Sequence, residues 1–307
     1  MTADVAGSRL LRDLVDAGLL IPTGVQGVLG RSGTFESVLL GFDALLDRVT
    51  APDGAEVVRF PPVMPRELLE TAGYMRSFPH LAGTVFSFGG SEADALDLGE
   101  RAERHEDWSD LQSMTEVMLA PAACYSVYPW VARAGPLPRG GRLVDISGAC
   151  FRNEPSEHPA RMQSFRMHEL VRVGHPAEVD EWRVAWIDRC GEILASVGLE
   201  TDVVPAADPF FGRVGAMLSS SQLEQNLKLE HVVPLDGDRP TAIASVNYHQ
   251  DHFGMDFGIR CADGELAHSA CTAFGLERIA LALYSAHGVD DREWPSEVRE
   301  LLSLTAP

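Results

Sequence analysis

Arg152 and Glu154 are two residues apart and are of types suited to holding a nucleotide. A guanidinium can hold a phosphate through two hydrogen bonds, and a carboxylate can accept a hydrogen bond from an exocyclic amine. We predict a strand over residues 143–154. Since side chains alternate between the two faces of a strand, Arg152 and Glu154 should point to the same side.

A return strand is predicted over residues 162–173, after a turn at residues 155–160 that is rich in turn-forming residues. Phe165, Met167 and Glu169 would share one face of this strand. If that face meets the first strand's arginine and glutamate in one cleft, the phenyl ring could stack on a purine. An exposed sheet face with cross-strand ion pairs would show the same pattern, so both interpretations stay open.

A second arginine, Arg278, lies in the first turn of a helix predicted to begin at about Gly275. Helix N-termini favour anions, so a cation there is electrostatically misplaced unless an anion binds nearby. Two arginines at separate sites would suit a bent triphosphate held at both ends. The alternative is an ordinary surface arginine.

The chain contains a single lysine, Lys228. Its neighbours, Asn226-Leu227-Lys228-Leu229, do not form a Walker A loop, which needs Gly-Lys-Ser/Thr. Chemistry that requires an amine must use this residue. A lysine left by chance in an arginine-rich composition is the competing interpretation.

Apolar residues at steps of three and four predict a helix over residues 35–49. A short strand follows at residues 55–60 and ends at Pro61-Pro62. Residues 91–110 are acidic and predict a solvated loop or surface helix. The remaining predictions are a helix at residues 178–198 and strands at residues 241–247 and 254–260. Such an arrangement indicates an α+β fold, with helices packed on an antiparallel sheet.

Composition narrows the classes of function. Hydrophobic residues make up 45% and charged residues 23%, as in soluble globular proteins. No apolar run of about 18 residues occurs, and the N-terminal residues lack a signal-peptide core, so a cytoplasmic location is the default expectation. The net charge of −20 and the absence of a basic run disfavour a large polynucleotide partner.

The five cysteines predict no disulfide framework, because their number is odd and no pair has C-x-x-C spacing. Any metal site must therefore combine distant positions, and each cysteine alone is more typical of a small buried apolar residue. One local alternative is His249, Asp251 and His252. On a strand His249 and Asp251 would share a face and His252 would point away.

Three stretches in the expected order resemble the motifs of class II aminoacyl-tRNA synthetases. Residues 35–62 are similar to motif 1, the dimer element. Phe151-Arg152-Asn153-Glu154 and the segment Arg161 to Glu169, within residues 143–173, resemble motif 2. Phe274-Gly275-Leu276-Glu277-Arg278-Ile279, within residues 266–286, resembles motif 3.

Other stretches resemble one branch of these proteins, the amino acid:[carrier protein] ligases, which are relatives of the atypical zinc-dependent seryl-tRNA synthetases. They include Leu20-Ile21-Pro22-Thr23-Gly24, Ser77-Phe78-Pro79-His80, Pro121-Ala122-Ala123-Cys124-Tyr125, Asp208-Pro209-Phe210-Phe211-Gly212-Arg213 and Asn247-Tyr248-His249-Gln250-Asp251-His252. The resemblance covers nearly the whole chain.

The resemblance implies roles in binding ATP. Arg152 would hold the α-phosphate, Glu154 would accept from the adenine amine, and Phe165 would stack on the ring. Arg161 and Arg278 would hold the distal phosphates, and Mg²⁺ would bridge the phosphates. The remaining residues implied for the nucleotide site are Met162, Lys228, Ala242, Ile243, Ala244 and Ser245.

The resemblance also implies a zinc ion bound by Cys124, Glu169 and Cys271. Thiolates and a carboxylate are acceptable zinc donors, and three protein ligands leave one position open. The substrate's amino group would fill that position. Glu169, Asn247 and His249 would contact the amino acid.

The implied activity is ATP-dependent activation of glycine or alanine and transfer to the phosphopantetheine thiol of a carrier protein, by a homodimer. We expect a single catalytic domain over residues 1–307 without tRNA-binding parts, and tRNA is an unlikely acceptor. Two alternatives remain. One is a minimal synthetase that aminoacylates an RNA or a small molecule. The other is a catalytically silent amino-acid-sensing paralogue, which would be expected to lack a motif arginine or a zinc ligand.

Overall fold

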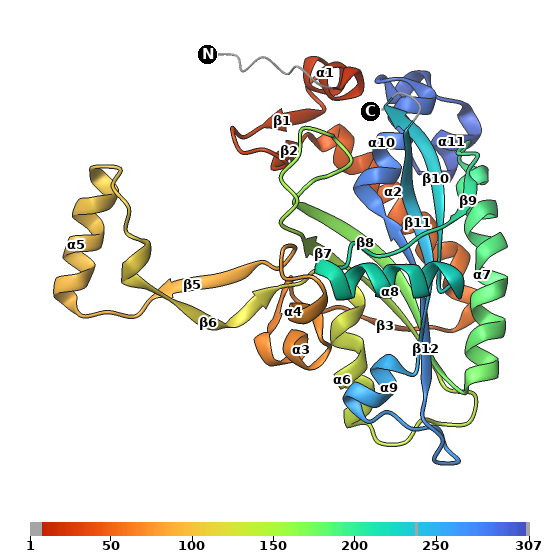
Figure 1. The fold of residues 1–307 in the computed structure, drawn as a ribbon. Coiled ribbons are helices and arrows are strands. Elements are labelled where there is room, and N and C mark those ends of the chain that lie inside the picture. Colours follow the sequence, from red (N-terminus) through yellow and green to blue (C-terminus); the bar gives the residue numbers. More distant parts are fainter. Residues whose placement is uncertain (1–7, 237–238, 305–307) are drawn as a thin grey trace.

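The computed structural model describes residues 8–236 and 239–304 and is built around a seven-stranded sheet (Figure 1). Six of its strands are antiparallel to their neighbours, and the edge strand β3 is parallel to β7. In spatial order the strands are β3 (Glu56–Val58), β7 (Arg142–Phe151), β8 (Ser164–Gly174), β12 (His268–Gly275), β11 (Arg239–Gln250), β10 (Lys228–Asp236) and β9 (Asp202–Pro205).

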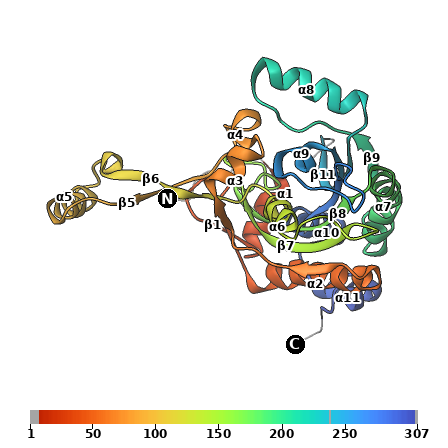
Figure 2. The same cartoon turned by 90° about the horizontal axis from the view of Figure 1, so that it is seen from below.

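One face of the sheet packs against three long helices, α2 (Gly33–Thr50), α7 (Pro176–Ser196) and α10 (Leu276–His287) (Figure 2). The apolar stripe of α2 is fully buried here, and Ser32 caps the helix by accepting from the Phe35 N–H. Phe42 of α2 packs against Phe274 of β12. The three helices therefore cover and stabilise this face of the sheet.

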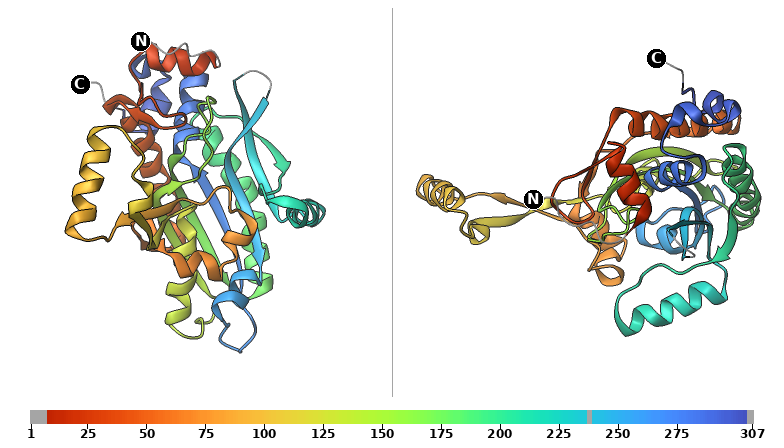
Figure 3. Two further views of the ribbon diagram at one scale, coloured as in Figure 1. Left: turned by 60° about the vertical axis from the view of Figure 1, so that its left-hand side comes forward. Right: turned by 90° about the horizontal axis from the view of Figure 1, so that it is seen from above.

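The opposite face carries the short elements η3 (Ala123–Ser126), α6 (Val127–Arg133) and α9 (His252–Phe257), which form a second core with β7, β8 and β12. Helix α8 (Gly212–Glu224) stands out beyond this face (Figure 3). It buries only Gly215, so it covers the sheet without being part of a core.

A long arm projects from the body (Figure 1). It consists of β5 (Thr84–Phe88), α5 (Glu92–Glu103) and β6 (Gln112–Leu119), and α5 has no buried residue. The smaller elements are α1 (Arg9–Asp16), β1 (Leu20–Pro22), β2 (Leu29–Arg31), η1 (Ala51–Asp53), β4 (Val63–Pro65), α3 (Arg66–Thr71), α4 (Tyr74–Ser77), η2 (Ser109–Leu111), η4 (Asp291–Glu293) and α11 (Ser296–Leu301). Within the described residues, no helix has the length and apolar character that crossing a bilayer requires.

Most of the predicted elements are confirmed, including the helix at residues 35–49, the helix at residues 178–198 and the long hairpin. The acidic segment contains the surface helix α5. The first hairpin strand ends at Phe151, three residues before the predicted end, because the chain turns away after Arg152 bonds to Gln163. The strand predicted at residues 254–260 is wrong: this segment contains most of helix α9, whose apolar residues pack into the second core.

A network of charged side chains joins four elements, β2, α2, β8 and α10. Arg166 of β8 donates to both carboxylate oxygens of Glu36 of α2, each at 2.8 Å, and to Glu277 of α10 at 3.0 Å. Arg31 also contacts both carboxylates. Since Glu277 is only 2% exposed, the two arginines compensate a buried charge.

We predict that Arg166→Met lowers the free energy of unfolding by about 3 kcal/mol, because it leaves two carboxylates with one shared arginine. Urea denaturation of the wild type and the variant measures the difference. Arg104→Met is the matched control. Arg104 forms exposed ion pairs with Glu100 and Glu106, which solvent screens, so its loss should leave the urea midpoint nearly unchanged. Equal effects of the two substitutions would contradict a central role for Arg166.

Candidate functional site

A cavity of about 690 Å³ opens on the sheet face opposite α2. Its floor is formed by β8, β11 and β12, and α8 and the segment around α4 form its walls. Phe165, Met167 and Glu169 of β8 all line it, which confirms that these three side chains share a face. The lining also includes the predicted nucleotide-site residues Arg152, Glu154, Met162, Lys228, Ala242, Ile243, Ala244, Ser245 and Arg278 and the predicted substrate-site residues Asn247 and His249.

Arg152 lies where β7 ends, and its position is fixed at two points. Its backbone N–H donates to Gln163 across the hairpin, and its Nε donates to the Pro121 carbonyl at 3.0 Å. The guanidinium carbon lies 5.5 Å from the centroid of the Phe165 ring. The hairpin therefore presents a cation and an aromatic face side by side inside the cavity.

Arg278 enters the same cavity from the first turn of α10. It donates to the carbonyls of Ala160 and Ala242 at 2.8 and 3.0 Å. Burial and the nearby positive charge of Arg152 lower the pKa of Arg278 to about 10. Two guanidinium groups buried in one cavity repel each other, so a bound polyanion would be stabilised there.

Lys228 also lines the cavity, and its partner Asp208 is a site residue to which the sequence interpretation assigned no role. Lys228 Nζ lies 2.7 Å from Asp208 and 3.2 Å from Glu230. Burial alone would raise the pKa of Asp208, but Lys228 and a hydrogen bond from Gln222 of α8 outweigh it and lower the pKa to about 2. Asp208 thus anchors α8 beside the lysine. Asp208 begins the stretch Asp-Pro-Phe-Phe-Gly-Arg, which resembles the ligase branch, and this resemblance could have indicated a role in the site.

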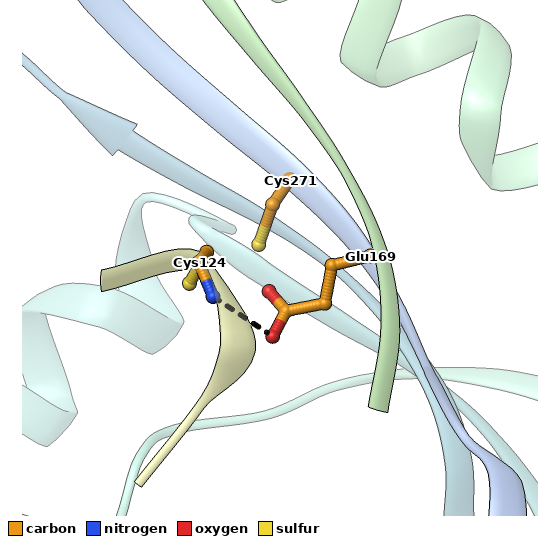
Figure 4. A group of neighbouring side chains, drawn as sticks. All are labelled: Cys124, Glu169 and Cys271. Atoms are coloured by element: carbon orange, nitrogen blue, oxygen red, sulfur yellow. Dashed lines mark hydrogen bonds between the residues drawn. The ribbon is translucent and has the colours of Figure 1, made fainter. Parts of the chain in front are cut away.

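Cys124, Glu169 and Cys271 meet at the other end of the cavity (Figure 4). One ligand atom from each lies within 4.8 Å of those of the other two, and all three residues are buried. The backbone N–H groups of Ala123 and Cys124 donate to one Glu169 oxygen at 2.8 and 3.3 Å. Elements η3, β8 and β12 therefore each contribute one donor.

The three groups influence one another's protonation in different directions: the hydrogen bond with Cys124 lowers the pKa of Cys271, whereas the pKa values of Glu169 and Cys124 are raised. Burial and the nearby Cys271 raise the pKa of Glu169 to about 7. A hydrogen bond with Cys271, together with burial, raises the pKa of the Cys124 thiol. A divalent cation would reverse both effects, and two thiolates with a carboxylate form a donor set that suits Zn²⁺. The residues present fit the metal.

One predicted residue, Arg161, and the alternative metal set His249, Asp251 and His252 lie elsewhere than a shared site would require. Arg161 does not line the cavity: its side chain is 56% exposed and lies 3.5 Å from Glu154. His249, Asp251 and His252 do not form a metal site, because His249 points toward Ser269 and Cys271 while His252 pairs with Asp256 in helix α9. No cluster with close donor atoms in the described part of the chain contains this set.

Comparison with known proteins identifies close relatives. Amino acid–[acyl-carrier-protein] ligases 1 and 2 of Bradyrhizobium diazoefficiens are each 45% identical to this chain. The alignments span 282 and 295 residues and cover 92% and 96% of this chain and 86% and 88% of the relatives. The sequence matches no family model.

Among solved structures, the SerRS of M. kandleri in complex with A. aeolicus tRNASec superimposes with a TM-score of 0.81 at 21% identity. It covers 96% of this chain, which spans 60% of that synthetase. The fold is therefore that of a class II synthetase catalytic core, as the three motifs predicted. Because the chain is 45% identical to the two ligases over most of its length, it belongs to the family of amino acid–[acyl-carrier-protein] ligases.

Proposed function

We propose that this enzyme uses ATP to activate a small amino acid, glycine or alanine, and transfers it to the phosphopantetheine thiol of a carrier protein. The observation that supports this most is the division of one cavity into two ends. Arg152 and Arg278 place two buried guanidinium groups at one end, and three buried donors at the other end suit a metal that could bind an amine. The identity to the carrier-protein ligases of Bradyrhizobium supports the acceptor.

In the first step, the amino-acid carboxylate attacks the α-phosphorus of ATP and the bond to pyrophosphate breaks. Arg152 would neutralise charge at the α-phosphate, and Phe165 and Glu154 would hold the adenine. Arg278 would hold the distal phosphates, with Mg²⁺ accompanying the triphosphate. Little covalent help is needed, because positioning and charge neutralisation lower the barrier.

Cys124, Glu169 and Cys271 would hold Zn²⁺, which supplies an open position for a neutral amine when bound. An amino acid held at that position would present its carboxylate toward Arg152. This arrangement would recognise the amino group and not the side chain of the amino acid. The limit on the size of the substrate's side chain would therefore come from the cavity walls.

In the second step, the carrier thiol attacks the carbonyl carbon of the aminoacyl adenylate. The carbon–oxygen bond to AMP breaks, the thiol proton leaves to solvent, and a thioester forms. The acceptor needs a path into the cavity from outside. Helix α8 borders the mouth and presents an exposed apolar side, with Met217 74% exposed, so we place carrier contact there.

We predict ATP–pyrophosphate exchange with glycine or alanine that falls to background when zinc is removed by a chelator. Cys271→Ser should lose both the zinc and the exchange, because the donor set becomes incomplete. Cys190→Ser is the matched control, since Cys190 is also buried but bonds to Thr272 on the far face of β12. A preference for a bulky amino acid would refute the small substrate. No exchange by zinc-loaded protein would favour the silent paralogue.

We predict thioester formation on a phosphopantetheinylated carrier and none on tRNA, measured with radiolabelled amino acid. Met217→Glu should slow transfer about tenfold and leave pyrophosphate exchange unchanged, because it alters a contact made only with the acceptor. If the enzyme instead transferred the amino acid to an RNA, a small thiol or an amine in preference to the carrier, this result would support the minimal-synthetase alternative.

We also infer a homodimer through residues 35–62. This region presents apolar side chains to solvent in one chain, with Leu40 of α2 at 52% and Val57 of β3 at 64% exposure, and β3 is an unpaired sheet edge. Sedimentation at micromolar concentration should therefore show a dimer. Val57→Asp should shift the equilibrium toward monomer. A wild-type protein that sediments as a monomer would remove the support for this interface.

A further inference from the structure

The three metal-type donors have unequal surroundings. Glu169 receives two backbone N–H groups, whereas the Cys271 sulfur faces two side-chain nitrogens. Asn247 Nδ2 lies 3.4 Å from this sulfur, and His249 Nε2 lies 3.7 Å from it. In the described part of the chain, no side-chain nitrogen is within hydrogen-bonding distance of the Cys124 sulfur.

The strand register places both side chains next to Cys271. Asn247 of β11 lies directly opposite Cys271 of β12 in the antiparallel ladder. His249 lies two residues further along β11, at a bulge in this pairing, and its side chain lines the same cavity as Asn247. Its ring is held edge-on by Phe253, with centroids 5.0 Å apart. The same strand pairing that forms the floor of the cavity thus sets these two contacts.

Two hydroxyl groups lie next to the Nδ1 atom of the His249 ring. Its Nδ1 lies 3.1 Å from Ser269 Oγ and 3.3 Å from the Tyr128 hydroxyl. A hydroxyl that donates to Nδ1 leaves the ring proton on Nε2, the atom that faces the sulfur. When Ser269 or Tyr128 donates to Nδ1, His249 is in the tautomer whose Nε2–H can donate to Cys271.

Two thiolates and a carboxylate around a divalent cation leave a net negative charge in a buried site. Hydrogen bonds from outside the ligand set disperse such charge and fix the direction of the ligand. Asn247 supplies an amide N–H and His249 a ring N–H to the same sulfur.

We infer that Asn247 and His249 are positioning residues for the metal, each donating a hydrogen bond to the Cys271 sulfur and thereby orienting this ligand. The inference rests on the zinc site of the proposed function. It gives the two residues a role beyond contact with the amino acid, because the hydrogen bonds act before any substrate arrives.

Zinc affinity, measured by competition with a chromophoric chelator in the absence of ATP and amino acid, tests this role. Asn247→Leu and His249→Phe should each weaken zinc binding by about 10- to 100-fold, because each removes one N–H donor. His249→Gln should recover part of the loss by restoring an N–H. Tyr248→Phe is the matched control: Tyr248 lies on the same strand as Asn247 and His249, and its loss removes a 2.6 Å contact with His268 of β12 and should leave zinc affinity unchanged.

Cobalt substitution provides a second readout. The sulfur-to-cobalt charge-transfer band should shift in Asn247→Leu and His249→Phe and not in Tyr248→Phe. If either variant fails to fold by circular dichroism, the double variant Ser269→Ala with Tyr128→Phe replaces it and should weaken zinc binding several-fold through the tautomer.

Wild-type zinc affinity and an unshifted cobalt band in both variants would overturn the inference. If the same variants also had a raised KM for the amino acid, Asn247 and His249 would be assigned to substrate contact alone. Failure of the wild type to bind zinc would overturn it as well. Loss of carrier transfer alone would count against the proposed acceptor and not against these hydrogen bonds, since the zinc measurement needs no acceptor.

Discussion

The two-residue period of strand β8 is the constraint on which the rest of the structure depends. Its even-numbered side chains face α2, where Arg166 bonds to Glu36 and His168 Nδ1 lies 2.7 Å from Asp43. Its odd-numbered side chains face the other side, where Phe165, Met167 and Glu169 line the cavity and Val171 and Val173 join the second core. A register slip of one residue would exchange the two sets, so the scaffold contacts and the site are specified by the same alternation.

Charge is handled differently on the two faces. Behind the sheet, each buried carboxylate has a cationic partner. The buried Asp145, for example, lies against His168. Burial alone would lower the pKa of His168, but Asp145 and Asp43 outweigh it and raise the pKa to about 9. In front of the sheet, the arginines and the cysteine–glutamate cluster lack such full compensation. A protein with a net charge of −20 thus keeps two buried guanidinium groups, those of Arg152 and Arg278, in its cavity. Ligands and a metal would complete the balance that the protein leaves open.

Local patterns in the sequence predicted much of the fold. The apolar periodicity of residues 35–49 and the alternating hairpin are strong signals, because one buried face imposes them over many residues. The segment at residues 254–260 lacked such a signal. Its apolar residues suit either a strand or a short helix, and packing of Phe253 and Phe257 into the second core decided for the helix.

By itself the sequence determined which chemical groups are available and the order of the motifs that carry them. It also determined which side chains share a strand face, since that depends only on local geometry. Family resemblance implied that Cys124, Glu169 and Cys271 meet, but their spacing does not show it, and it is the tertiary structure that brings them together. The tertiary structure also pairs Asp208 with Lys228 and leaves Arg161 outside the cavity. These outcomes depend on the register between strands far apart in the chain and on loop paths, which no local pattern encodes.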